Sequence, residues 1–155
     1  MPVFEHSFIV KHPLAAVAEF HHNPMALKRL NPPGVRVQFH QLEALGEGSI
    51  VEFSLWFGPF PIRWRARHQN VNFLQGFTDV QEVGPLKTWE HTHAIEALGE
   101  NTRVSDRVRY QFQPGWRRFW TRIMFSWIGL KALFAYRAFA TRRAVSAVKS
   151  QKTAG

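Results

Sequence analysis

Two histidines and an aspartate occupy strand faces that should otherwise be apolar. The residues around His91 and His93, and those around Asp106, alternate between polar and apolar with a period of two, which predicts two strands. The two histidines share a face with Trp89, and Asp106 shares a face with Tyr110. Burial of ionisable groups without partners is costly, so this pattern indicates a sheet surface that borders a cavity.

A tight turn at Gly99-Glu100 predicts how the two strands pair, because glycine tolerates the positive φ of such turns. Folding about this turn places His93 opposite Asp106, with their Cβ atoms roughly 5 Å apart. The other expected pairs are Ile95 with Val104, His91 with Val108, and Trp89 with Tyr110. Three interpretations stay open: a structural pair, a polar anchor for a ligand, or a catalytic dyad with His93 as general acid or base and Asp106 fixing its tautomer.

Metal binding is a weaker hypothesis for the same residues. His91 and His93 lie two residues apart on one face, and Asp106 or Asp79 could add a carboxylate ligand for zinc or iron. We nevertheless predict neither a metal site nor a cofactor. The neighbouring histidines at 21 and 22 lie on a predicted helix, point in different directions, and are expected to face solvent.

Length and composition predict one domain over residues 1–149, followed by a frayed tail at 150–155. The chain of 155 residues has no cysteine, which excludes disulfides, thiolate catalysis and cysteine metal sites. The N-terminus lacks a basic start followed by an apolar run, so no secretory signal is predicted and a cytoplasmic location is expected.

The positive charge is concentrated in the last third of the chain. The formal net charge is +9, with +11 from Arg107 onward and −2 before it. An anionic membrane surface, an acidic protein or a nucleic acid would each complement such charge. No recognised nucleic-acid motif or base-stacking platform accompanies it, which argues against nucleic acid.

The predicted elements are one strand, two short helices, six strands and one long helix. The first five strands are expected at 3–10, 35–43, 49–57, 62–71 and 73–83, before the hairpin, and the helices at 13–22, 24–30 and 116–149. This order is typical of an α+β layer design, in which a curved seven-stranded antiparallel sheet wraps around the C-terminal helix.

Fourteen Phe and six Trp are many for a chain of this size, and ligand pockets are typically lined by aromatic rings with a few placed polar groups. On the terminal helix, Trp116, Trp120, Ile123, Trp127, Leu130 and Phe134 follow one face. The expected cavity lining is Phe53, Leu55, Trp64, His68, Phe77, Trp89, His91, His93, Asp106, Tyr110, Ile123, Trp127 and Leu130. The register of residues 79 to 81 is open; one choice turns Asp79 and Gln81 inward, and a one-residue slip turns them outward.

The order of elements, the run 76–85, the pattern Trp89-x-His91-x-His93 and the pattern Asp106-x-x-x-Tyr110 resemble the START-related SRPBCC superfamily. The likeness covers essentially the whole chain and points to its small bacterial, polyketide-cyclase-like members. It implies a helix-grip fold with an apolar cavity between the sheet and the C-terminal helix. It does not imply one activity, because the superfamily includes lipid carriers, hormone receptors and cyclases, and no residue set here matches a catalytic signature.

The function predicted from these features is binding of a small hydrophobic molecule, such as a lipid, a quinone or a polyketide-like compound. The alternative is a cyclase or dehydratase that uses His93 and Asp106 on a ligand in the same cavity.

A second apolar stripe on the terminal helix needs a partner of its own. It comprises Phe125, Ile128, Ala132, Tyr136 and Phe139, on the face expected to point away from the sheet. Arginines beside the stripe suit an anionic membrane surface. A homodimer would bury the stripe equally well, with the facing arginines offset or neutralised by counter-ions. The chain is therefore predicted to be cytoplasmic or peripheral to a membrane. Arg122, Lys131 and Arg137 interrupt the segment, which excludes a simple transmembrane helix.

Overall fold

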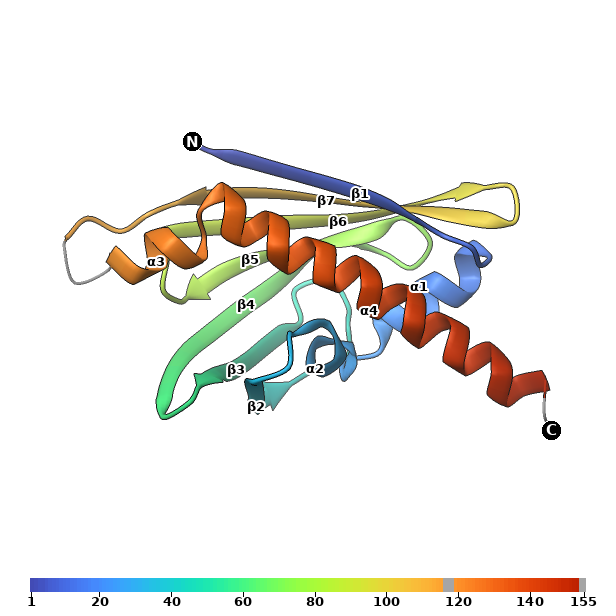
Figure 1. The fold of residues 1–155 in the computed structure, drawn as a ribbon, viewed down its shortest axis with the longest axis horizontal. Coiled ribbons are helices and arrows are strands. Elements are labelled where there is room, and N and C mark those ends of the chain that lie inside the picture. The colour runs from blue at the N-terminus through green and yellow to red at the C-terminus, as the bar shows by residue number, and fades with distance from the viewer. Residues whose placement is uncertain (116–118, 154–155) are drawn as a thin grey trace.

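Seven antiparallel strands form one sheet with the order β1-β7-β6-β5-β4-β3-β2, and a long helix lies across one of its faces (Figure 1). The structure is a computed structural model and describes residues 1–115 and 119–153. The strands are β1 Val3–Val10, β2 Val35–Leu42, β3 Ile50–Phe57, β4 Phe60–Asn72, β5 Gly76–Val83, β6 Thr88–Leu98 and β7 Asn101–Gln111. The helices are α1 Leu14–His22, α2 Ala26–Leu30, α3 Phe119–Met124 and α4 Trp127–Thr153.

The predicted α+β helix-grip fold is confirmed, together with the register of the hairpin that carries the histidines. His93 lies opposite Asp106 in the β6–β7 pair, and His91 lies opposite Val108. Residues on these two strands alternate between buried and more exposed along most of their length, as the period of two predicts. Strand β1 pairs with β7, so the first and the last strand of the chain lie side by side in the sheet.

Strand β5 begins later than expected because a turn takes the residues before it. The backbone N–H of Gln75 donates to the carbonyl of Asn72, and the N–H of Leu74 donates to the side chain of Asn72. Gly76, the first residue of β5, has φ +116, a conformation that glycine adopts readily. Strand β4 in turn extends beyond the predicted range 62–71 at both ends.

The apolar core lies in two clusters between the sheet and the helices. One cluster packs Phe4 and Val108 of the sheet against Leu130 and Phe134 of α4. The other joins β1, α1, β6, β7 and the second half of α4. Burial of these side chains against α4 stabilises the helix on the sheet.

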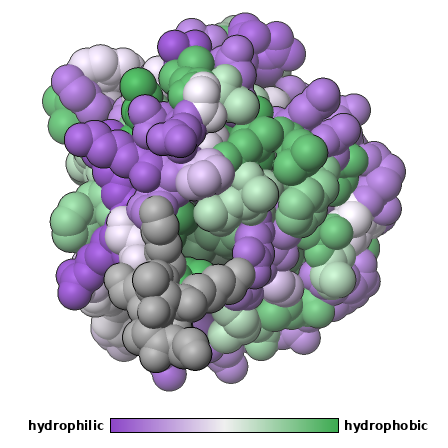
Figure 2. All heavy atoms as spheres, turned by 90° about the vertical axis from the view of Figure 1, so that its right-hand side faces the viewer, coloured by the Kyte–Doolittle hydropathy of each residue, from purple (hydrophilic) through white to green (hydrophobic). Residues whose placement is uncertain are grey.

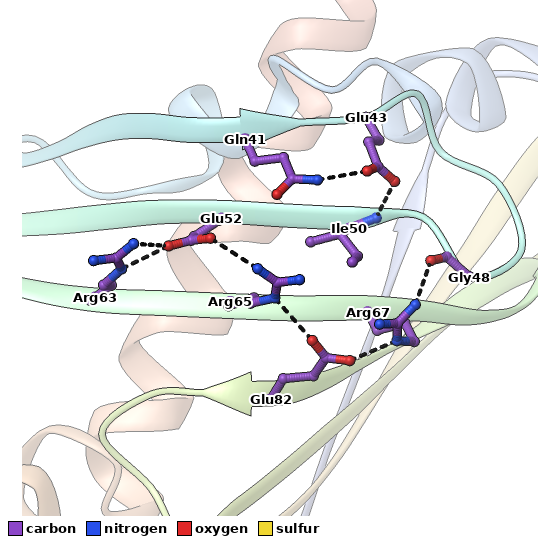
Figure 3. A network of polar contacts seen from close by, with 9 residues as sticks. All are labelled: Gln41, Glu43, Gly48, Ile50, Glu52, Arg63, Arg65, Arg67 and Glu82. Atoms are coloured by element: carbon purple, nitrogen blue, oxygen red, sulfur yellow. Dashed lines mark hydrogen bonds and ion pairs between the residues drawn. The ribbon is translucent and has the colours of Figure 1, made fainter.

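The outer face of the sheet carries a network of ion pairs across β3, β4 and β5 (Figure 3). Glu52 on β3 accepts hydrogen bonds from Arg63 and Arg65 on β4. Glu82 on β5 accepts from Arg65 at 3.0 Å and from Arg67 at 2.6 Å. The arginines of β4 therefore point away from the cavity, which leaves its alternate residues to face inward.

The predicted single helix at 116–149 is instead two helices, and this break changes which residues face inward. Ser126 lies between them; its hydroxyl donates to the carbonyl of Ile123 at 2.7 Å and accepts from the N–H of Gly129 at 3.1 Å. Since Ser126 provides a polar partner at the start of α4, the helix can begin anew at this point. Trp116 lies outside the described residues, and α4 continues past the expected end at Lys149 to Thr153.

The exposed surface does not by itself identify a membrane or protein partner. No helix in the described part of the chain is long and apolar enough to cross a membrane. At the end of the molecule on the right of Figure 1, hydrophobic side chains gather in one area beside hydrophilic ones (Figure 2). Folded proteins normally leave part of their apolar surface exposed, so this area alone identifies no partner.

Replacement of Gly76 by alanine tests how tightly β5 packs on β6. A Cβ at this position would collide with the backbone carbonyl of His93, and the positive φ adds strain. We expect Gly76→Ala to lower the free energy of unfolding by about 3 kcal/mol or more, measured by denaturant titration. Gly99→Ala is the matched control, because φ is +61 there and no heavy atom lies within 4 Å, so a loss of only about 1 kcal/mol is expected. Equal losses would contradict the close approach.

Candidate functional site

A cavity of about 580 Å³ lies between the inner face of the sheet, α4 and the segment that contains α1 and α2. Its wall is mainly apolar, with polar groups contributed by β5, β6, β7 and α4. Most of the residues predicted to line the cavity are found in its wall, namely Phe53, Leu55, Trp64, His68, Phe77, Trp89, His91, His93 and Asp106. These residues come from five neighbouring strands, and the alternation along each strand places them on the same side of the sheet.

Four predicted lining residues lie elsewhere. Tyr110 and Leu130 are buried in the core beside the cavity rather than in its wall. Ile123 and Trp127 are 59% and 60% exposed, because the break between α3 and α4 turns them outward. Phe125, which the unbroken helix would have pointed outward, is buried and faces the cavity instead.

The second stripe predicted on the terminal helix is therefore divided. Phe125 and Tyr136 line the cavity, whereas Ile128 and Phe139 are exposed, at 75% and 56%. The stripe does not form one continuous outward face.

His91 is the centre of the polar wall. Its Nδ1 lies 2.9 Å from Oδ1 of Asp79 on β5, and its Nε2 lies 2.9 Å from Oδ1 of Asp106 on β7. A carboxylate can only accept, so both ring nitrogens of His91 must donate, which requires the imidazolium form. Burial would lower the pKa of His91, but the charges and hydrogen bonds of Asp79 and Asp106 outweigh it and raise the pKa to about 9.

The two carboxyl groups remain ionised in these surroundings. Burial would raise the pKa of Asp106, but hydrogen bonds from His91 and His93 outweigh it and hold the pKa well below its ordinary range. Burial would likewise raise the pKa of Asp79, but the charge and hydrogen bond of His91 outweigh it and lower the pKa. Trp89 donates from its indole nitrogen to the other oxygen of Asp79, at 3.2 Å.

His93 contacts Asp106 through only one of its nitrogens. Its Nδ1 lies 2.9 Å from Oδ1 of Asp106, so Nδ1 donates the hydrogen bond. Its Nε2 is buried and has no hydrogen-bond partner among the described residues. The Asp106 contact fixes the ring and tautomer of His93 and leaves Nε2 available to a ligand.

His21, expected to face solvent, lies in the cavity wall instead. Its ring is 4.1 Å from the ring of His93, centroid to centroid, and its Nδ1 lies 2.9 Å from the carbonyl of Val17. Burial, reinforced by the neighbouring His93, lowers the pKa of His21 to about 3, so the ring is neutral. His22 also borders the cavity, where its ring contacts Phe73. Nothing in the sequence indicated that His21 and His22 would border the cavity, because the packing of α1 against the rest of the fold determines which face of this helix points inward.

Asp79 and Gln81, whose register on β5 the sequence left open, differ in their relation to the cavity. Asp79 lies opposite His91 and lines the cavity. Gln81 lies outside the cavity lining and donates to the carbonyl of Leu86 at 2.9 Å.

Arg137 on α4 was missed as a site residue. In the sequence it counted only as a charge that interrupts an apolar helix. It lies three residues after Phe134, and this helical spacing was the available signal that both share a face. Arg137 lines the cavity, and its guanidinium lies over the ring of Phe134, 5.1 Å from the centroid.

His91, His93 and Asp106 also form a group that could hold a metal ion, since their ligand atoms lie within 4.8 Å of one another. The contacts in this structure are of another kind. The nitrogen–oxygen distances of 2.9 Å are those of hydrogen bonds, with a proton between each pair of atoms. A metal would have to replace these protons.

Comparison with known proteins shows a likeness in fold. No protein-family model matches the sequence, and no curated protein matches it either. The Zhui aromatase/cyclase from Streptomyces sp. R1128 is 14% identical with a TM-score of 0.75, and the match covers 94% of this chain and 93% of that one. A norcoclaurine synthase from Thalictrum flavum is 17% identical with a TM-score of 0.67, and 96% of each chain is covered.

A third match lies within a longer protein, the nucleoside-diphosphate sugar epimerase from Corynebacterium glutamicum. It is 22% identical with a TM-score of 0.73, and covers 97% of this chain and 30% of that one. These matches agree with the helix-grip fold. At such identities the likeness concerns the fold and carries no residue roles.

The charged state of His91 makes a prediction about pH. Its pKa in the folded chain, about 9, exceeds the ordinary value of 6.5, so its contribution to stability is complete below pH 6.5 and is lost as the pH rises through 9. We expect the free energy of unfolding to fall over this range by an amount of order 3 kcal/mol at most. The low pKa values of Asp79 and Asp106 act only in acid, where their contribution is lost as the pH falls through them.

Substitution of Asp106 tests the cause. In Asp106→Asn the pKa of His91, measured by ¹⁵N NMR of its ring nitrogens, should fall. The loss of stability at alkaline pH should become smaller. Glu96→Gln is the control, because Glu96 is an exposed carboxylate of the same hairpin that pairs with Arg103. An unchanged His91 titration in Asp106→Asn would contradict the assigned contact.

Proposed function

We propose that the protein binds a small hydrophobic molecule in the cavity between the sheet and α4. The observation that supports this most is the combination of a volume near 580 Å³ with a mainly apolar wall and one polar side. Sites for small molecules are typically concave, apolar and provided with a few oriented polar groups. The molecules that suit such a site include lipids, quinones and polyketide-like compounds.

The apolar and the polar side of the wall would bind different parts of the guest. Aromatic rings of Phe53, Trp64 and Phe77 provide flat apolar surface for the body of the guest. His93 and Asp106 lie on the polar side, where the unpaired Nε2 of His93 can accept a hydrogen bond from a hydroxyl of the guest. The similarity in fold to an aromatase/cyclase and to norcoclaurine synthase is consistent with a guest of this kind.

The dimer and membrane hypotheses now rest on fewer residues. Of the five residues of the stripe, Ile128, Ala132 and Phe139 are exposed, whereas Phe125 is buried and Tyr136 is half-buried. We keep both hypotheses as secondary to ligand binding.

Filling the cavity tests the proposal. Leu55 lines the wall on β3, and Leu55→Trp would place a larger ring in the space available to a guest. We expect this change to weaken binding of the neutral fluorescent probe N-phenylnaphthylamine by about tenfold or more. Trp127→Ala removes a ring that is 60% exposed and outside the wall, so probe affinity should stay the same. Failure of the wild type to bind the probe better than an ordinary globular protein would overturn the proposal.

A second candidate, catalysis in the same cavity, is favoured by the Asp106–His93 contact. Since Nδ1 of His93 donates to Asp106, neutral His93 has a lone pair on Nε2 and can accept a proton from a guest. Removal of a proton beside a carbonyl and its return elsewhere are the proton transfers that a cyclase or dehydratase needs. Asp106 would act as a positioning residue, because its Oδ1 accepts from Nδ1 of His93 and thereby fixes the tautomer and orientation of that ring.

His93→Gln separates the two functions once native mass spectrometry has identified the guest that co-purifies with the protein from its own source. For a binding protein, the change should alter affinity for the guest, and the guest should be recovered chemically unchanged from the wild type. For an enzyme, the change should reduce turnover at least about a hundredfold while much of the binding is retained. An altered guest after incubation with wild type, but not with His93→Gln, would make catalysis the primary function.

A further inference from the structure

We infer that the guest of this cavity carries an acidic oxygen group, a carboxylate, and that Arg137 of α4 binds it. This inference rests on the proposed ligand-binding function and adds the chemical class of the ligand. It follows from the lack of a hydrogen-bond acceptor at Arg137 and from the charge around a neighbouring groove.

Arg137 is a partly buried cation in the cavity wall, and no described residue accepts a hydrogen bond from its buried Nε. Its Nε is buried and makes no hydrogen bond with any described residue, and no carboxylate in that part of the chain lies within ion-pair distance. The one contact recorded for its guanidinium is with the ring of Phe134. A guanidinium has five N–H donors in a planar fork, and a buried donor without an acceptor is unfavourable.

The nearest acidic groups are already committed to other donors. Oδ1 of Asp106 accepts from both His91 and His93, and the two oxygens of Asp79 accept from His91 and Trp89. Arg137 acts on these carboxylates only through its electric field, which helps to hold the pKa of Asp79 low. Both carboxylates therefore have donors other than Arg137, and the donors of Arg137 remain for another acceptor.

A carboxylate on the guest matches what Arg137 lacks. Its two oxygens can accept two parallel hydrogen bonds from the guanidinium fork, which is the strongest neutral-pH arrangement for this side chain. An ester or a ketone offers an acceptor without the charge, and an alkane offers neither. The remainder of the wall is apolar, so the ligand class is an apolar molecule with one acidic end, such as a fatty acid or an aromatic acid.

A basic groove shares a wall with the cavity. It lies between α2 and α4 and has four residues in common with the cavity lining, namely Asn31, Pro32, Val35 and Tyr136. Its other residues include the cations Lys28, Arg29 and Arg143 and no Asp or Glu. Positive charge at the surface raises the local concentration of anions, so this groove favours an acidic ligand near the cavity.

The test compares dodecanoic acid with methyl dodecanoate as competitors for the neutral probe N-phenylnaphthylamine. The proteins are wild type, Arg137→Gln, Arg137→Lys and Lys131→Gln, the last being the matched control because Lys131 is exposed on α4 and lies outside both linings. We expect the wild type and Lys131→Gln to bind the acid about tenfold or more tightly than the ester. Arg137→Gln should lose that preference while its affinity for the ester changes little, and Arg137→Lys should keep part of it.

The outcomes separate this inference from the function on which it rests. If the wild type binds neither the probe nor either competitor, the proposed ligand-binding function fails. If the probe and the ester bind but the acid binds no more tightly than the ester, ligand binding stands and the acidic ligand is refuted, whatever the variants do. If the preference survives in a folded Arg137→Gln, Arg137 is not its source and the assignment is overturned.

Discussion

The site depends on one charged ring, that of His91, held between two carboxylates. His91 belongs to β6, Asp79 to β5 and Asp106 to β7, so a single side chain joins three neighbouring strands on their inner face. A shift of any of these strands by one residue would turn its polar group to the other side and leave its partners buried and unpaired. The contact therefore specifies the pairing of the middle of the sheet as well as the polarity of the cavity.

The arrangement around His91 also shows why the cavity can be mainly apolar and still polar at one side. Phe134 of α4 packs against the ring of His91, with 5.4 Å between centroids, so the charged cluster is shielded by a side chain from the opposite layer. Low polarity strengthens each hydrogen bond within the cluster and makes any unpaired group unfavourable. Among the described residues that line the cavity, the buried side-chain nitrogens without a hydrogen-bond partner are Nε2 of His22, Nε2 of His93 and Nε of Arg137, and a ligand with polar atoms could pair with them.

Local patterns predicted the sheet well and the helices less well, for physical reasons. The period of two along β6 and β7, together with the turn at Gly99, was sufficient for the His93–Asp106 pairing because backbone geometry leaves few alternatives. The break at Ser126 was not visible, since apolar residues surround the helix on several faces and one unbroken helix satisfied the same pattern. Packing of whole layers decided the rest, including the inward positions of His21 and Arg137.

A chain that encloses so large a cavity lacks the packing contacts that a filled interior would have. Any molecule that occupies the cavity of the folded chain, and does not bind the unfolded chain, shifts the folding equilibrium by mass action. At a hundred times its Kd such a molecule adds about 2.7 kcal/mol to the free energy of unfolding, which is a sizeable part of the stability of an ordinary domain. For a molecule that binds the cavity in the cell, resistance of the protein to proteolysis would rise and fall with the concentration of that molecule, and the steady-state amount of the protein would follow it.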